Sequence, residues 1–121
     1  MPKTVLIVDD SKTIRDMVSF TLKKEGFDTV EAEDGQDALS KIGAARFDLV
    51  ISDVNMPRMD GLSLTKQLRQ QPAFRSTPIL ILTTEADAAK KAAGKEAGAT
   101  GWILKPFDPE KLLSVVGRVC R

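Results

Sequence analysis

The sequence predicts an α/β fold, a doubly wound five-stranded parallel sheet in the order 2-1-3-4-5 with helices on both faces. Five short apolar runs alternate with amphipathic stretches, which is typical of strands alternating with helices. Three of the runs are continuously apolar, as in parallel strands covered on both faces, and one is short and polar, as in an edge strand. In chain order the runs lie at 5–8, 28–30 (the polar one), 49–51, 79–82 and 102–104.

The segments between these runs carry helix signals. An apolar stripe that includes Ile14, Val18 and Leu22 is followed by Gly26, a residue that commonly ends helices. Asp108-Pro109-Glu110 combines a helix cap, a first-turn proline and a first-turn acid. Further stripes lie at Ala38, Leu39 and Ile42, at Leu62, Leu64 and Leu68, and at Leu112, Leu113, Val116 and Val119.

The segment 87–97 differs from the other predicted helices. Its apolar residues are almost all alanine, and Gly94 inside it costs about 1 kcal/mol of helix stability relative to alanine. We therefore expect the least firmly held helix of the domain there.

Length and composition narrow the class of protein. The 121 residues are enough for one domain, and no repeat, low-complexity tract or linker divides them, so we expect a single domain over 1–121 without an output domain. Eighteen basic against seventeen acidic residues argue against nucleic-acid binding. The sequence has no histidine, which excludes histidine-based triads and histidine-ligated metal sites.

Compartment signals point to the cytoplasm. The single cysteine, Cys120, rules out an internal disulfide framework and suits a reducing compartment. No apolar run approaches the roughly 20 residues of a membrane span. Asp9-Asp10 interrupts the first apolar run, so the start lacks the core of a secretion signal. The sequence therefore predicts a cytoplasmic protein that does not bind membranes.

Polar side chains stand where the predicted strands end. Asp9-Asp10, Ser52-Asp53, Thr83-Thr84 and Lys105-Pro106 follow the first, third, fourth and fifth runs. Taken singly, each residue is better explained as a helix cap or a solvated side chain. In a sheet of order 2-1-3-4-5, however, these strand ends converge on one crevice.

Three carboxylates in one crevice repel one another by a few kcal/mol per pair, which one lysine offsets only in part. Hard oxygen ligands with excess negative charge suit Mg²⁺, which is usually bound by one or two carboxylates and several waters. A metal and a lysine beside an exposed aspartate would neutralise an incoming phosphoryl group, and aspartate can attack phosphorus. The residues thus predict phosphoryl transfer onto Asp53.

Four segments make the prediction more specific. They are Val5-Leu6-Ile7-Val8-Asp9-Asp10-Ser11, Asp53-Val54-Asn55-Met56-Pro57-Arg58-Met59-Asp60-Gly61, Thr83-Thr84-Glu85 and Lys105-Pro106-Phe107. Over essentially its whole length the chain resembles the receiver domain of two-component response regulators, in particular the stand-alone, CheY-like chemotaxis type.

The resemblance implies a role for each matching residue. Asp53 is the phosphoacceptor, and Lys105 and Thr83 contact phosphoryl oxygens. The Mg²⁺ ligands are Asp10, Asp53 and the backbone carbonyl of Asn55, with Asp9 acting through a metal-bound water. The Lys105–Pro106 bond is expected to be cis.

The resemblance also implies which residues take part in switching and which set the lifetime of the phosphate. Thr83 and the aromatic Trp102 form the expected switch, although the family often has alanine where Thr84 stands and commonly Tyr or Phe where Trp102 stands. Asn55 and Glu85, each two residues beyond a site residue, are expected to tune dephosphorylation. A core aromatic remains the alternative for Trp102.

The implied partners are a CheA-like histidine kinase, a target such as a flagellar motor switch protein and, optionally, a phosphatase, with the chain a monomer. The implied activity is not that of an enzyme: the domain would only phosphorylate itself from small phosphodonors and remove its own phosphate. A phosphorelay intermediate or a phosphate sink would carry the same site. An Asp-nucleophile phosphatase would need a separate acid-base residue, and a flavodoxin-like cofactor binder a phosphate loop where Asp9-Asp10 stands.

Overall fold

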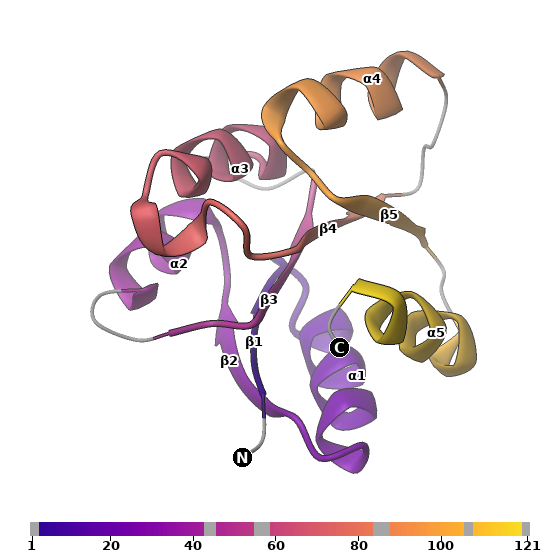
Figure 1. The fold of residues 1–121 in the computed structure, drawn as a ribbon. Coiled ribbons are helices and arrows are strands. Elements are labelled where there is room, and N and C mark those ends of the chain that lie inside the picture. Colours follow the sequence, from indigo (N-terminus) through magenta and orange to yellow (C-terminus); the bar gives the residue numbers. More distant parts are fainter. Residues whose placement is uncertain (1–2, 43–45, 55–58, 84–87, 106–107, 120–121) are drawn as a thin grey trace.

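The computed structural model describes residues 3–42, 46–54, 59–83, 88–105 and 108–119. Five parallel strands form one sheet in the order β2-β1-β3-β4-β5, which confirms the predicted topology (Figure 1). The strands are β1 (Thr4–Val8), β2 (Asp28–Ala32), β3 (Leu49–Asp53), β4 (Ile79–Thr83) and β5 (Gly101–Leu104).

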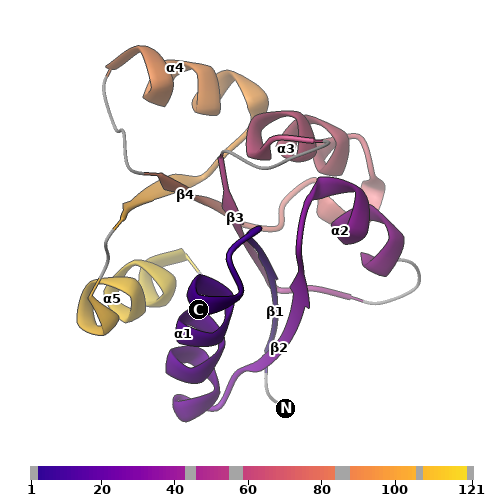
Figure 2. The same ribbon diagram turned by 180° about the vertical axis from the view of Figure 1, so that it is seen from behind.

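The helices cover both faces of this sheet (Figures 1 and 2). One face carries α1 (Lys12–Lys24) and α5 (Pro109–Val119). The other carries α2 (Gly35–Ile42), α3 (Gly61–Arg69) and α4 (Ala88–Ala97), with a short 3-10 turn, η1 (Pro72–Phe74), after α3. Among the helices that the structure describes, none is both long enough and apolar enough to cross a bilayer.

Two apolar clusters separate these helix layers from the sheet. Side chains alternate along each strand, so neighbouring residues of β1 enter opposite clusters. Leu6 and Val8 pack with α2 and α3, whereas Val5 and Ile7 pack with α1 and α5. Every side chain of β3 and β4 is buried, as the continuously apolar runs predict, and the edge strand β2 is more exposed.

All five strands extend further than the apolar runs predict, and two of the extensions carry site residues. β3 includes Ser52 and Asp53, and β4 includes Thr83. The ladder continues because backbone pairing does not depend on apolar side chains. Asp53 is thereby set beside Leu82, and Thr83 beside Leu104. Both polar residues are held in the rigid sheet rather than in a loop.

Local signals in the sequence set several helix ends. The Ser11 hydroxyl accepts from the Ile14 amide and caps α1, and Gly26 follows that helix with a φ of 92°. The Asp108 carboxylate accepts from the Lys111 amide, which caps α5 as the sequence predicts.

The alanine-rich helix α4 has an anchor that its composition does not reveal. The indole of Trp102, from β5, lies against Gly94, and a Cβ at that position would overlap the ring. Gly94 therefore makes room for a large side chain from a neighbouring strand. Its cost in helix propensity is offset by this packing.

Candidate functional site

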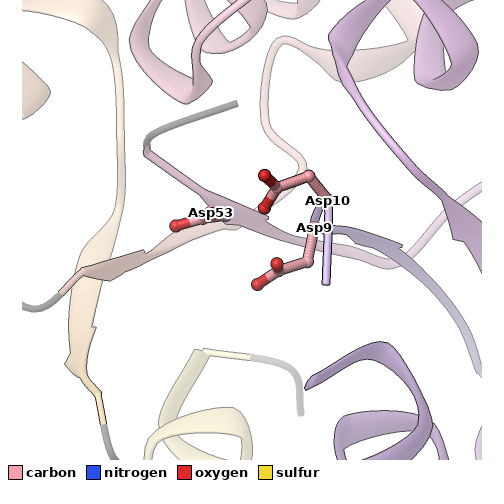
Figure 3. Close-up of side chains that lie close together, drawn as sticks. All are labelled: Asp9, Asp10 and Asp53. Atoms are coloured by element: carbon pink, nitrogen blue, oxygen red, sulfur yellow. The ribbon is translucent and has the colours of Figure 1, made fainter. Parts of the chain in front are cut away.

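Three carboxylates meet at the carboxyl edge of the sheet (Figure 3). Asp9 and Asp10 follow β1, and Asp53 ends the adjacent strand β3. One oxygen of each carboxylate lies within 4.8 Å of the others. Asp9 and Asp53 are buried, whereas Asp10 is exposed. The structure thus brings together the three aspartates that the sequence places at strand ends.

Lys105 bridges the two buried carboxylates. Its Nζ lies 3.0 Å from Asp9 Oδ2 and 3.0 Å from Asp53 Oδ1. Its backbone N–H donates to the carbonyl of Thr83 over 2.8 Å, which extends the pairing of β4 and β5 to the site. The lysine therefore reaches the two buried carboxylates from the end of β5, which β4 separates from β3. Its position after β5 predicts this placement.

The Asp9 carboxylate is fixed on both oxygens, since Oδ1 accepts from the Ser11 amide over 2.9 Å. Arg15, a residue without a predicted role, donates from Nη1 to the Asp9 backbone carbonyl over 2.7 Å. Its Nε lies 3.4 Å from a carboxylate oxygen of Glu31 on β2. A basic residue one turn into the helix that follows an acidic pair is the signal that could have identified it.

The surroundings shift the pKa values of Asp53 and Lys105. Burial raises the pKa of the Asp53 carboxyl, and the hydrogen bond from Lys105 offsets only part of that effect. Burial by itself would lower the pKa of Lys105, but its bonds to Asp9 and Asp53 outweigh this, so that pKa is raised. The raised pKa of Asp53 and the raised pKa of Lys105 both indicate a pocket in which a second cation would be stabilising.

Gly61, at the start of α3, is a further site residue without an individually predicted role. Its amide donates to the Val54 carbonyl over 2.9 Å, and a Cβ on it would overlap the backbone carbonyl oxygen of Asp53. Glycine thus allows α3 to approach the end of β3. The Asp60-Gly61 pair, in which Asp60 caps α3, is the signal in the sequence.

Two of the remaining predicted residues, Thr83 and Trp102, lie in the strands next to the site. Thr83 is 2% exposed and lies at the end of β4, next to the site strand β3. Trp102 is half-buried against the apolar cluster that includes α2 and α3, so the alternative of a core aromatic fits its position. Asn55, Glu85 and Pro106 lie outside the described residues, and so does the predicted cis bond before Pro106.

The oxygen donors fit a hard divalent cation. Three carboxylates carry more negative charge than Lys105 balances, and the exposed Asp10 leaves the cluster open to solvent. Mg²⁺ requires few protein carboxylates and retains several waters, which such an open cluster allows. The sequence has no histidine, and the cluster within the described residues offers only aspartate oxygens, whereas zinc usually takes histidine or cysteine ligands.

The excess charge predicts a response to metal removal. In chelator, Asp10→Asn should raise the melting temperature by about 2–4 °C because it removes a like charge from the cluster. Mg²⁺ should raise the melting temperature of the original sequence more than that of the variant. Thermal scans with and without Mg²⁺ measure both effects. Asp28→Asn, which changes an exposed carboxylate at the start of β2, is the control and should alter neither the melting temperature in chelator nor its increase with Mg²⁺. A lower melting temperature for Asp10→Asn in chelator would contradict the prediction.

Comparison with known proteins identifies the family. The model of the response regulator receiver domain matches residues 5–117, so the chain belongs to the family of response regulator receiver domains. Members of this family typically bind Mg²⁺ at an acidic pocket. The chemotaxis response regulator CheY4 of Vibrio cholerae has a similar structure, with a TM-score of 0.96 and 52% identity over 98% of this chain and 99% of that one.

Curated relatives include receivers of different lengths. Protein PilG of Pseudomonas aeruginosa is 38% identical over 93% of this chain and 83% of its own length. The alkaline phosphatase synthesis transcriptional regulatory protein PhoP of Bacillus subtilis is 37% identical over 100% of this chain. The chain spans 50% of the length of PhoP.

Proposed function

We propose that this chain is a two-component signalling protein that accepts a phosphoryl group on Asp53 from a phosphohistidine of a histidine kinase. The observation that carries the proposal is the bridge from Lys105 to Asp53 beside the other two aspartates. A carboxylate oxygen of Asp53 attacks the phosphorus, and a P–O bond forms as the P–N bond breaks. The electron pair of that bond remains on the imidazole nitrogen.

The other residues of the pocket orient this transfer. Lys105 moves from its two carboxylate partners to a phosphoryl oxygen, and the Thr83 hydroxyl donates to another. Asp10, Asp53 and the backbone carbonyl of Asn55 would hold Mg²⁺ directly, and Asp9 would hold it through water; the ion would supply positive charge against the phosphoryl oxygens. Asn55 and Glu85 tune how fast water removes the phosphate. Turnover beyond self-phosphorylation and self-dephosphorylation is not part of this function.

Phosphorylation switches the surface formed by α4, β5 and α5. Thr83 moves toward the phosphoryl group, and Trp102 turns inward behind it. Two features of this surface suit a protein partner: Leu104 is 53% exposed, and Lys91 and Lys95 are exposed on α4. Only a few kcal/mol of differential stabilisation are needed to change the population of such an element.

Control of chemotaxis is the cellular role that we favour, with a CheA-like kinase upstream and a flagellar motor switch protein as the target. The support is the similarity to CheY4, which this chain matches over nearly the full length of both. In this role the chain acts as a stand-alone, monomeric, cytoplasmic receiver. A phosphorelay intermediate or phosphate sink would share the site but would not retain a flagellar switch component in a pulldown with the beryllofluoride-loaded protein.

Labelling with a small phosphodonor tests the proposal. Acetyl phosphate with Mg²⁺ should add one phosphoryl group to the intact chain, seen by mass spectrometry. Chelator should prevent the addition, and Asp53→Asn should abolish it because the attacking oxygen is lost. Asp16→Asn, an exposed carboxylate on α1, should label normally. Labelling that survives in Asp53→Asn would overturn the proposal.

A further inference from the structure

Arg69, the last residue of α3, makes a set of contacts unlike those of any other described side chain. Its Nε donates to the carbonyl of Gly98 over 2.9 Å. Its Nη1 donates to the carbonyls of Phe74 and Thr77, each over 2.6 Å. Longer contacts of 3.4 Å reach the Arg75 carbonyl and the Thr100 hydroxyl. One guanidinium therefore joins α3, η1, the start of β4 and the segment between α4 and β5.

The contact with Gly98 is made at the C-terminal end of α4. The Gly98 amide closes the helix by donating to the carbonyls of Gly94 and Lys95, at 3.1 and 3.0 Å. Gly98 has a φ of 105°, and a Cβ on it would lie 2.8 Å from Arg69 Cγ. The helix end is thus shaped to receive both the stem and the guanidinium of this arginine.

Further bonds secure the same end to the sheet. The Thr100 amide donates to the Ile79 carbonyl over 2.7 Å, and the Thr100 hydroxyl accepts from the Ile79 amide over 3.0 Å. Arg69 contacts Thr100 itself and the carbonyl of Thr77, which lies two residues before Ile79. Figures 1 and 2 show the C-terminal end of α4 beside α3, whereas the N-terminal end extends away from it.

We propose that Arg69 is a positioning residue that makes the C-terminal end of α4 the pivot of the switch. This inference rests on the proposed function, in which the signal arises at Thr83. That signal reaches α4 at its N-terminal end, because Thr83 precedes Ala88 in the chain. With the other end fixed by Arg69, α4 swings about Gly98 rather than sliding as a whole.

The position of the pivot determines how far α4 is displaced at Gly94, where the indole of Trp102 packs. Ala88 lies ten residues from Gly98 and Gly94 lies four, which is about 15 Å and about 6 Å along a helix. A displacement at Ala88 is therefore reduced to about two-fifths at Gly94. Because the indole already fills the space at Gly94, even this smaller shift must move Trp102 or be resisted by it.

Amide hydrogen exchange followed by NMR tests the anchor without phosphorylation. Arg69→Met keeps the stem of the side chain and removes every donor. Exchange of the Gly98, Ala99 and Thr100 amides should become about tenfold faster or more, the factor expected from losing one charge-assisted hydrogen bond. Exchange at Ile7 and Ile51 should not change. Lys66→Met, one turn earlier on the exposed side of α3, is the matched control and should leave all these amides unaffected.

The pivot has a second readout. With beryllofluoride, exchange in the original sequence should change most near Ala88 and least near Gly98, and Arg69→Met should abolish this gradient. Arg69→Lys, which retains charge and one donor group, should give intermediate values and replaces Arg69→Met if that variant does not fold. Unchanged exchange at 98–100 in the variants, or an equal change along α4 in the original sequence, would overturn the inference. Failure of Asp53 labelling would count against the proposed function and leave the anchor measurement intact.

Discussion

Lys105→Met should destabilise the domain by about 3 kcal/mol at neutral pH in chelator, the loss expected when one partner of a buried ion pair is removed. The side chains of Asp9 and Asp53 are 0% and 8% exposed, and Lys105 is the cation that bridges them. Without it, two buried carboxylates face each other uncompensated. Urea unfolding measures the loss, and Lys111→Met, an exposed lysine on α5, should be close to neutral.

The effect should depend on pH with a definite sign. Burial raises the pKa of Asp53 in the folded state above its unfolded value, so the stability linked to this group is present below about pH 4 and is lost as pH rises through the folded pKa. Removing Lys105 removes the contact that offsets this loss. The difference in free energy of unfolding between Lys105→Met and the original sequence should therefore become smaller toward pH 4 and larger above it. A difference that is constant across this range would contradict the account of the pocket.

Lys105 itself titrates at the other end of the pH scale. Its folded pKa is raised by Asp9 and Asp53, so its contribution is complete below the ordinary lysine pKa of about 10.4 and is lost as pH rises through the folded value. Mg²⁺ should reduce the cost of Lys105→Met because the metal supplies part of the missing positive charge.

Gly61→Ala should cost about 2–3 kcal/mol, although alanine is the better helix former. The added Cβ would overlap the backbone carbonyl oxygen of Asp53, and neither the helix nor the buried strand can yield without moving the other. The shift should also displace the Asp53 carboxylate, so phosphodonor labelling should slow together with the loss of stability.

Gly117→Ala is the matched control for this substitution. Gly117 lies in α5, and a Cβ on it meets nothing within 4 Å. The change should stabilise the domain by about 0.5–1 kcal/mol, since alanine favours the helix without a clash. If Gly61→Ala were as stable as Gly117→Ala, the close approach of α3 to Asp53 would not be a constraint.

The sheet and the meeting of its strand ends could be predicted from sequence because both follow from general rules. Continuous apolar runs indicate parallel strands, and the strand order determines which carboxyl ends are adjacent. This is why Asp9 and Lys105, separated by 96 positions in the chain, could be predicted to share one pocket.

The contacts that could not be predicted from the sequence depend on side-chain packing, which the spacing of apolar residues along the chain does not encode. Gly94 counts as a weakness in a helix until the indole of Trp102 is seen to occupy the space beside it. Arg69 resembles an ordinary surface arginine in the sequence, yet it donates to the backbone carbonyl of Gly98 beyond α4. The length of a strand such as β3, which extends to Asp53, is set by backbone pairing and is equally hidden.

A crystal structure of the complex with Mg²⁺ and beryllofluoride is the most direct test of how the pocket works. Beryllium should be bonded to a carboxylate oxygen of Asp53, Mg²⁺ should contact Asp10 and Asp53, and Lys105 Nζ should have moved onto a fluoride. Beryllium bonded to Asp9 or Asp10, or a metal bound away from the three aspartates, would contradict the account.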